Sequence, residues 1–383
     1  MLGVLGGGQL GNYFVLAAKS LGYQTAVLDP DPNAPARKNA DCHIIANYDD
    51  AEALDELSRI CTAVTIEFEN PPVSSLQFLA QHVVVRPSPA CVAIAQDRRE
   101  EKRFCQSIGL AVAPYEVIET PEDATRIMTH GISSGHLGPL HLPLLMKTAR
   151  MGYDGKGQQK ITDLAQIAEV WNQLGGVPCV VEQMIPLDAE FSVILARSTD
   201  GNVAVFEPTL NIHTDGILDI STAPIKPVNN HMMARVVTLG RQAATLIAEQ
   251  LNYVGVLAVE CFVSEGNLYI NELAPRPHNS GHWTLDAAHT SQFEQQVRTL
   301  VGQPLGDPSM KFPAVTMVNF LGDRWANGEP LIHLANAEKQ ATMHLYGKQD
   351  ARPGRKMGHL TVVGENPAIT TNAALTLRDA MTL

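Results

Sequence analysis

ECFVSEGNLYINELAPRPHNSGH, residues 260–282, is the stretch around which the rest of the chain is organised. Residues 256–263 alternate and are rich in β-branched and apolar side chains, residues 264–267 have the composition of a turn, and residues 268–272 are again largely apolar. Alternation on both sides of turn residues predicts a β-hairpin.

Pairing across this hairpin brings two acids together. A turn at residues 264–267 places Cys261 opposite Leu268 or Ile270, so Glu260 and Glu272 lie near each other at one end. Carboxylates about 4 Å apart repel by roughly 4 kcal/mol at an effective dielectric near 20, so such a pair needs a cation or a shared proton.

Magnesium satisfies this requirement because it prefers hard oxygen ligands, and the amide oxygen of Asn271 offers one more. The pattern therefore predicts a Mg²⁺ site at Glu260 and Glu272. Two solvated strand ends are the alternative.

A proline-rich loop with polar side chains follows the hairpin. It contains Arg276, His278, Asn279 and His282, interrupted by two prolines and a glycine. Prolines fix the backbone and prevent a helix or a central strand, so we expect an ordered loop. A cation, an amide and two imidazoles beside the predicted metal suit an anionic substrate.

Length and charge set the class of protein. The chain has 383 residues, enough for two or three domains, and a formal net charge of -12. This charge argues against nucleic acid and against an anionic membrane surface as partners. No apolar run reaches about 18 residues, the start lacks signal-peptide features, and the six cysteines are scattered. We expect a cytoplasmic protein with free thiols.

The N-terminus begins with a strand at residues 2–5, a glycine turn and a helix. Gly6, Gly8 and Gly11 fit the G-x-G-x-x-G pattern, and Asp29 follows after about 20 residues. Backbone amides at a helix start hold a sugar phosphate as well as a dinucleotide. A tight turn without a ligand is the third interpretation.

More βα units follow. A strand at residues 63–68 leads into Glu67-Phe68-Glu69-Asn70, at the edge where parallel sheets bind ligands, so these residues are a site candidate. A charged helix opening at residues 96–102 marks the boundary of the first domain.

A second α/β unit spans residues 111–183 and contains KTARMGYDGKGQ, residues 147–158. Its three glycines give a flexible loop whose amides can wrap phosphates, while Lys147 and Lys156 bring positive charge. We interpret this loop as a lid that excludes water; a plain glycine hairpin is the alternative.

The remaining elements follow from periodicity and composition. Residues 211–217 are interpreted as a polar loop, residues 232–250 and 285–300 each as one helix, and residues 311–321 as the start of a last β region. Four cations lie in nine residues near the C-terminus: Lys348, Arg352, Arg355 and Lys356. They indicate a phosphate clamp, with a solvated basic turn as the alternative.

Four motifs carry a resemblance to a known family: GGGQLG at 6–11, GYDGKGQ at 152–158, NELAPRPHNSGHWT at 271–284 and RPGRKMGH at 352–359. Together they closely resemble the N5-carboxyaminoimidazole ribonucleotide synthetases, ATP-grasp enzymes of purine synthesis. The resemblance implies an α/β and α+β protein with an ATP-grasp fold.

Its domains would be a preATP-grasp, Rossmann-like αβ domain at 1–96, an ATP-grasp domain at 97–310 with a lid subdomain at about 111–183, and a small β-rich C-terminal domain at 311–383.

The resemblance implies residues for ATP with one or two Mg²⁺ ions. Glu260 and Glu272 would hold the metal. The ATP contacts would be Arg98, Lys147, Gly152, Tyr153, Asp154, Gly155, Lys156, Gly157, Gln158, Glu182, Gln183, Met184, Ile185, Glu190, His213, Asn271 and Glu272. Lys156 stands where many members have arginine, so a bidentate contact becomes a point charge.

The second substrate by resemblance is 5-aminoimidazole ribonucleotide. It would contact Gln9, Leu10, Tyr153, Asp154, Asn279, Lys348 and Arg355. The catalytic residues would be Asp154 and His278, which handle protons and orient the amine, together with Lys156 and with Arg276 near bicarbonate. No NAD is needed, and the family suggests a homodimer.

The implied reaction is phosphorylation of bicarbonate by ATP, followed by transfer of the carboxyl group to the ribonucleotide amine. Rival interpretations are another ATP-grasp ligase, such as a formate-dependent glycinamide ribonucleotide transformylase or a peptide-type ligase, a NAD-dependent oxidoreductase, and an inactive nucleotide-binding protein. Residues 130–143 look like an insertion, and neither they nor residues 366–383 carry chemistry that we can assign.

Overall fold

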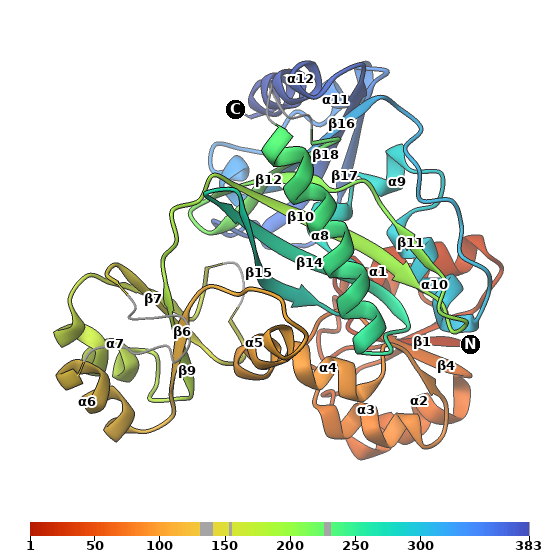
Figure 1. Ribbon diagram of the computed structural model, residues 1–383. Helices are drawn as coiled ribbons and strands as arrows, with labels where there is room; N and C mark the ends of the chain where they lie inside the picture. The colour runs from red at the N-terminus through yellow and green to blue at the C-terminus, as the bar shows by residue number, and fades with distance from the viewer. Residues whose placement is uncertain (131–140, 153–154, 226–230, 383) are drawn as a thin grey trace.

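The computed structural model describes residues 1–130, 141–152, 155–225 and 231–382, whose strands form three sheets (Figure 1). The first sheet is parallel, with the order β3-β2-β1-β4-β5. Its elements are β1 Leu2–Leu5, α1 Gln9–Ser20, β2 Thr25–Leu28, β3 Cys42–Ile44, α2 Ala51–Ile60, β4 Ala63–Ile66, α3 Val73–Ala80, β5 Val84–Val85 and α4 Pro89–Ala95.

This sheet is buried because β1, β2 and β4 consist almost entirely of apolar residues, which lie inside when helices cover a parallel sheet. The strand order changes direction between β1 and β4, so the ends of these two strands open side by side. The glycine turn after β1 and the acids after β4 therefore meet at one edge.

The second sheet has four antiparallel strands in the order β6-β9-β7-β8 and lies apart from the first, with α5 between them (Figure 1). Its strands are β6 Tyr115–Ile118, β7 Leu144–Thr148, β8 Gln158–Ile161 and β9 Cys179–Gln183. The helices of this region are α5 Arg98–Ser107, α6 Pro121–His130 and α7 Ile167–Gln173. Ile127 of α6 and Trp171 of α7 pack on this sheet and form its core.

The third sheet is the largest and runs β15-β14-β10-β12-β13-β16-β18-β17, with β11 beside β10. Its strands are β10 Ala189–Arg197, β11 Val203–Val205, β12 Thr209–Thr214, β13 Ile217–Ala223, β14 Gly255–Ser264, β15 Asn267–Ala274, β16 Ala314–Leu321, β17 Ala341–Leu345 and β18 Lys356–Gly364. The helices around it are α8 His231–Gln250, α9 Thr284–Ala287, α10 Gln292–Val301, α11 His333–Ala337 and α12 Pro367–Ala380.

Alternation in β10 and β14 separates the two faces of this sheet. Phe191 and Leu257 belong to the core beneath α8, while Ile194 and Ala258 belong to the core on the other face. Since side chains alternate along a strand, Glu260 shares the face of Ala258. The same face thus changes from apolar to polar along β14.

The predicted hairpin is confirmed, with a tighter turn than expected. Ser264 pairs with Asn267, so the turn consists of Glu265 and Gly266, both with positive φ. Two such residues make the turn that matches the twist of a hairpin. Glu260 pairs with Glu272.

Cys261 pairs with Ile270, so Asn271 is the extra residue of a β-bulge on β15. A bulge at this place re-aims the side chains beside it.

Two predictions about local structure were wrong. Residues 211–217 are not a loop: they belong to β12, a two-residue turn and the start of β13. The Asn211 side chain is buried because it bonds Ser192 and Ser221 on the neighbouring strands.

Residues 285–300 are not one helix, because α9 ends at Ala287 and Ser291 caps the start of α10. Between them, Ala288 is extended and bridges to Met310.

The C-terminal strands continue the large sheet, since β13 pairs with β16 and β16 with β18. Helix α12 packs on β16 and β18 through a core that includes Phe320, Leu360 and Ala374. The loop between β17 and β18 is thereby held to the central part of the molecule. Among the helices that the structure describes, none has the length and apolar character needed to cross a membrane.

Candidate active site

One cavity of about 1160 Å³ lies where the three sheets meet, and most of the predicted site residues line it. They are Gln9, Leu10, Arg98, Lys147, Gly155, Lys156, Gln158, Glu182, Gln183, Met184, Ile185, Glu190, His213, Glu260, Asn271, Glu272, Arg276, His278, Asn279, Lys348 and Arg355. Gly152 and Gly157 are not part of this lining. Tyr153 and Asp154 lie outside the described residues, so their roles remain predictions.

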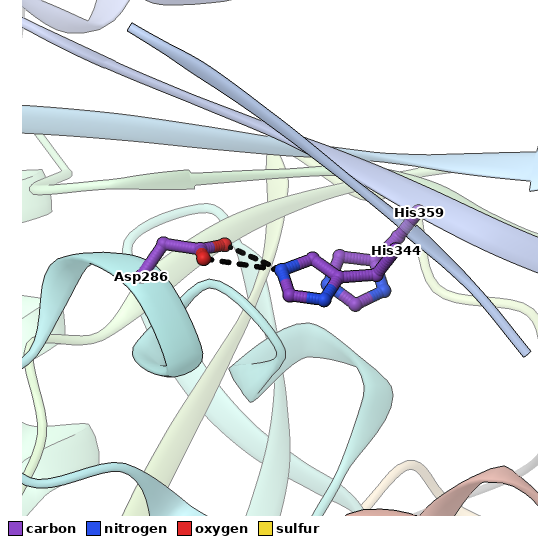
Figure 2. Close-up of side chains that lie close together, drawn as sticks. All are labelled: Asp286, His344 and His359. Atoms are coloured by element: carbon purple, nitrogen blue, oxygen red, sulfur yellow. Dashed lines mark hydrogen bonds and ion pairs between the residues drawn. The ribbon is translucent and has the colours of Figure 1, made fainter. Parts of the chain in front are cut away.

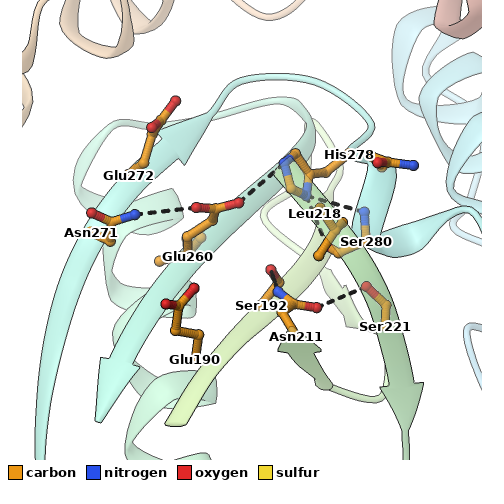
Figure 3. A network of polar contacts seen from close by, with 12 residues as sticks. Glu190, Ser192, Asn211, Leu218, Ser221, Glu260, Asn271, Glu272, His278 and Ser280 are labelled. Atoms are coloured by element: carbon orange, nitrogen blue, oxygen red, sulfur yellow. Dashed lines mark hydrogen bonds and ion pairs between the residues drawn. The ribbon is translucent and has the colours of Figure 1, made fainter. Parts of the chain in front are cut away.

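The two acids of the hairpin stand together on one wall of the cavity (Figure 3). Asn271 donates to Glu260 at 3.2 Å, and Arg98 binds Glu272 at 3.1 Å. Burial, and then the charge of Glu272, raise the pKa of Glu260 to about 6. Two carboxylates and an amide oxygen are the hard donors that Mg²⁺ prefers, so these residues fit that ion.

A histidine and a third acid lie next to this pair. His213 Nδ1 lies 2.7 Å from Glu190 Oε2. Burial alone would lower the pKa of His213, but the hydrogen bond with Glu190 and the charges of Glu260 and Glu190 raise it above its ordinary value. This wall of the cavity is therefore strongly acidic.

A buried cluster with a net positive charge lies at another part of the cavity, which Lys147 and Glu182 line. Lys147 Nζ lies 2.9 Å from Glu182, and Lys102 Nζ lies 3.1 Å from its other oxygen. Burial would raise the pKa of Glu182, but Lys102 and Lys147 lower it to about 2. Burial also lowers the pKa of Lys147, which Glu182 partly offsets.

The loop after β15 is held by ion pairs from other parts of the chain. Arg276 binds Glu69 through Nε and Nη2, both at 2.6 Å. His278 Nδ1 lies 2.8 Å from the Ser280 hydroxyl and accepts the Ser280 N–H, while Nε2 lies 3.3 Å from Glu260.

Burial and the charge of Arg276 hold the pKa of His278 well below its usual range. His278 is therefore neutral, with its proton on Nε2 facing Glu260.

Asn279, predicted to contact the ribonucleotide, also has a partner within the protein. Its side chain lines the cavity but pairs with Asn319 of β16 through two amide hydrogen bonds of 3.1 and 2.7 Å. Buried amides need such partners. Asn279 thus anchors the loop to the sheet in this structure.

The C-terminal cations reach the same cavity from the loop between β17 and β18. Lys348 Nζ donates to Gln9 Oε1 at 2.6 Å, which joins this loop to the start of α1. Arg355 donates to the Asp350 carbonyl at 2.8 Å, and Lys356 also lines the cavity. The four cations predicted as a phosphate clamp therefore all line the cavity, and Lys348 lies next to the start of α1.

The glycine turn itself is closed by acids of this chain. Gly7 N–H donates to Asp29 at 2.6 Å and Gly8 N–H donates to Glu67. A Cβ on Gly8 would lie 2.1 Å from a Glu67 oxygen, so a larger residue there would displace the Glu67 carboxylate. These two amides hold side chains of the protein where the motif predicted a phosphate.

Sequence reasoning left four residues of this region without an assigned role: Glu67, Glu69, Lys102 and Asn319. The two acids follow a strand at the ligand-binding edge of a parallel sheet, and that signal had marked them as candidates. Lys102 stood in the charged helix that was predicted only as a domain boundary, and it is 1% exposed. Nothing local marks Asn319, whose partner lies 40 residues away.

Comparison with known families covers most of the chain. Residues 1–96 match the ribonucleotide synthetase preATP-grasp domain, residues 103–293 match the ATP-grasp domain, and residues 315–373 match the phosphoribosylaminoimidazole carboxylase C-terminal domain. The N5-carboxyaminoimidazole ribonucleotide synthase of Brucella melitensis is 40% identical over 363 residues, which cover 94% of this chain and 95% of that protein.

Solved structures agree with this comparison. The ADP complex of an N5-carboxyaminoimidazole ribonucleotide synthetase is 37% identical, with a TM-score of 0.89 and coverage of 100% of this chain and 97% of that one. An N5-carboxyaminoimidazole synthase from Aspergillus clavatus in complex with ADP and 5-aminoimidazole ribonucleotide is 27% identical, with a TM-score of 0.85 and coverage of 99% and 98%. The chain therefore belongs to the N5-carboxyaminoimidazole ribonucleotide synthase family of ATP-grasp ligases.

Proposed function

We propose that this protein uses ATP and bicarbonate to carboxylate the amine of 5-aminoimidazole ribonucleotide, giving N5-carboxyaminoimidazole ribonucleotide for purine synthesis. The observation that carries this proposal is that the acidic hairpin and the cationic loop of Lys348 and Arg355 line the same cavity. The names of the relatives and the ribonucleotide bound in the Aspergillus clavatus protein support the same acceptor.

The nucleotide would lie between the four-stranded and the large sheet. Lys147 reaches it from β7 and Arg98 from α5, and both side chains are largely buried. Glu260 and Glu272 would hold Mg²⁺, one or two ions, and the metal would neutralise charge on the phosphoryl oxygens. Because Arg98 already contacts Glu272, the same arginine links the hairpin to the phosphates.

The first step transfers the γ-phosphoryl group of ATP to an oxygen of bicarbonate, which gives ADP and carboxyphosphate. The amine of the ribonucleotide then attacks the carbon, the bond from carbon to the phosphate oxygen breaks, and the amine loses a proton. Carboxyphosphate is short-lived in water, so the site must exclude solvent. Gly155, Lys156 and Gln158 of the lid loop line the cavity and suit this task.

Arg276 and His278 would serve the bicarbonate and amine end. Arg276 stays charged, since Glu69 and other acids outweigh its burial and raise its pKa. A neutral His278 with its proton on Nε2 donates a hydrogen bond, which suits an orienting role. Asp154 remains our choice for the proton acceptor, with Lys156 beside it, on the strength of the family resemblance alone.

The ribonucleotide phosphate would bind Lys348 and Arg355 near Gln9 and Leu10. Residues Gly7 and Gly8 already hold acids, so the phosphate depends on these cations more than on the glycine amides. We also infer a homodimer from the family resemblance, which sedimentation of the purified chain would test.

The experiment that tests the function is ADP release with Mg²⁺, ATP and bicarbonate, with and without the ribonucleotide. Strong stimulation by the ribonucleotide is the expected result. ADP release that responds only to another acceptor, such as glycinamide ribonucleotide with formate, would assign the chain to a different ATP-grasp reaction. Absence of ADP under every condition would contradict the enzymatic role.

A further inference from the structure

A second group of ligand-type side chains lies outside the cavity. Asp286, His344 and His359 each offer one ligand atom, and these three atoms lie within 4.8 Å of one another (Figure 2). His344 and His359 are directly opposite on the antiparallel strands β17 and β18, and Asp286 comes from α9. None of the three lines the cavity.

Among the contacts that the structure describes for this group, one ring nitrogen of His359 has no hydrogen-bond partner. His344 Nε2 lies 3.0 and 3.1 Å from the two oxygens of Asp286. The rings of His344 and His359 are stacked, with centroids 4.5 Å apart and planes at 14°. His359 Nδ1 bonds the Tyr346 hydroxyl at 3.0 Å, but its Nε2 is buried and has no hydrogen-bond partner within the described part of the chain.

An ordinary pair of a histidine and an acid explains only part of this arrangement. It accounts for His344 and Asp286 and leaves the fully buried His359 nitrogen unexplained. Burial, and then the charges of His282 and His344, hold the pKa of His359 well below its usual range, so this ring is neutral. Neutral imidazole is the form that binds metal ions.

We propose that Asp286, His344 and His359 bind one divalent transition-metal ion of the Zn²⁺ class. Two imidazoles and a carboxylate supply three protein ligands, and water completes a tetrahedron. With bonds of about 2.0 to 2.1 Å, neighbouring ligand atoms of a tetrahedron lie about 3.3 Å apart, close to the spacing between His344 and Asp286. Because the two rings are stacked in this structure, ion binding requires the His359 ring to turn out of the stack so that Nε2 reaches the same point.

The surroundings support this assignment. The Tyr346 hydroxyl is hydrogen-bonded to Nδ1 of His359, and metal-bound histidines commonly have such a partner on their other ring nitrogen. The side chains of Asp286 and His344 are 17% and 22% exposed, which gives an ion access from solvent. The site also has a defined place in the fold, because Tyr13 of α1 packs its ring against His344 and His359.

A metal at this place joins three parts of the chain. It ties α9 to β17 and β18, at the base of the loop that carries Lys348 and Arg355 into the cavity. Its main effect is therefore on stability, and it takes no part in the chemistry. The site is independent of the function proposed above.

The test uses the full-length protein without a histidine tag, freed of metal with a chelator and titrated with Co²⁺. We expect one equivalent to bind, with the visible absorption of tetrahedral Co²⁺, and Zn²⁺ to displace it and raise the melting temperature. Asp286→Asn and His344→Gln should each weaken binding at least about tenfold, since loss of a residue that only hydrogen-bonds a metal ligand already costs about 10- to 100-fold. His333→Gln, on the exposed side of α11, is the matched control.

Several outcomes would overturn the site. The first is that Co²⁺ shows no saturable binding, and the second is that both variants bind Co²⁺ as tightly as the parent. The third is that the absorption band is lost in Glu272→Gln, which would place the ion at the hairpin. If neither the parent nor the two variants bind Co²⁺ although all three fold normally, the group is an ordinary hydrogen-bonded pair of His344 and Asp286 without a metal.

Discussion

Glu182 and Glu260 are both buried at the same cavity, yet their environments are opposite. Glu182 lies between Lys102 and Lys147, which lower its pKa to about 2 in spite of burial. Burial and the neighbouring Glu272 raise the pKa of Glu260 to about 6. Burial acts the same way on both, so the neighbours decide. Glu182 lies between two lysines of the chain, whereas Glu260 lies beside another acid and the neutral His278.

The two environments are linked by one helix. Arg98 and Lys102 both come from α5, and Arg98 contacts Glu272 while Lys102 contacts Glu182. Glu101 of the same helix accepts the Leu273 N–H of β15 at 2.8 Å. Helix α5 thus fixes the distance between the basic and the acidic wall.

The largest effect should come from removing half of the acidic pair. Glu272→Gln removes a charge that the proposed Mg²⁺ needs and leaves Arg98 without its partner. We expect kcat/KM for ADP release to fall by about a hundred- to a thousandfold, or about 3 to 4 kcal/mol. Glu265→Gln, exposed in the turn of the same hairpin, should change little. A Glu272→Gln enzyme with near-normal rates would show that the hairpin does not hold the metal.

Breaking the compensated pair should affect folding. Lys102→Met leaves Glu182 buried with one lysine in place of two, and the loss of a partner from a buried ion pair costs about 3 kcal/mol or more. Urea unfolding would measure this loss. Lys19→Met removes a half-exposed lysine paired with Asp41, and should cost less than about 1 kcal/mol. Equal losses in the two variants would refute the contrast between buried and exposed pairs.

The pH dependence of stability should separate the two glutamates. A raised pKa means that folded Glu260 holds its proton more tightly than the unfolded chain, so stability falls as pH rises from 4.5 to about 6 and is constant above. Glu182 acts in the other direction: its contribution is present above pH 4.5 and is lost as pH falls toward 2.

Melting of the metal-free protein with Glu260→Gln tests this difference. Because glutamine does not titrate, the variant should gain stability over the parent between pH 4.5 and 6, and the gain should level off above pH 6. A gain that is independent of pH in this range would contradict the raised pKa of Glu260. Glu182 contributes no slope in this window.

The smallest effect should come from the turn that sets the pairing. Gly266 has φ +73°, so Gly266→Ala should cost about 1 kcal/mol of unfolding free energy, with a small addition because Cβ would meet Met232 Sδ at 2.4 Å. Gly22→Ala, at φ +84° in open space, measures the backbone strain alone. If Gly266→Ala abolished activity without lowering the free energy of unfolding, the turn would control the site more than the strand pairing does.

The hairpin could be predicted from the sequence because its register depends on local signals. Alternation fixes which side chains share a face, and a two-residue turn fixes which residues are opposite. Glu260 and Glu272 therefore came out as neighbours. The register of Asn211 could not be found in this way, since its partners Ser192 and Ser221 lie on other strands and satisfy an amide that looked solvent-facing.

The glycine motif shows the other limit. Its spacing correctly indicated a strand, a turn and a helix, but the spacing does not say what binds the amides. Asp29 and Glu67 come from the ends of β2 and β4, and they meet Gly7 and Gly8 only once the sheet order is known. The ion pair of Lys102 with Glu182 was missed for the same reason.

Residues 285–300 were predicted as one helix because the helical spacing of apolar residues continues past Ala287, where α9 ends. The Ser291 side chain accepts from Glu294 N–H and starts a new helix, a signal that was present in the sequence. Ala288 leaves the helix to bridge with Met310, a contact that no local pattern reveals.

The most direct test of the account is the fate of an oxygen atom. Bicarbonate labelled with ¹⁸O would be incubated with the enzyme, Mg²⁺, ATP and 5-aminoimidazole ribonucleotide, and the inorganic phosphate analysed by mass spectrometry. If carboxyphosphate forms in this cavity, each phosphate carries one oxygen from bicarbonate. Phosphate without the label, formed while ADP accumulates, would mean that water attacks ATP directly and would contradict the proposed reaction.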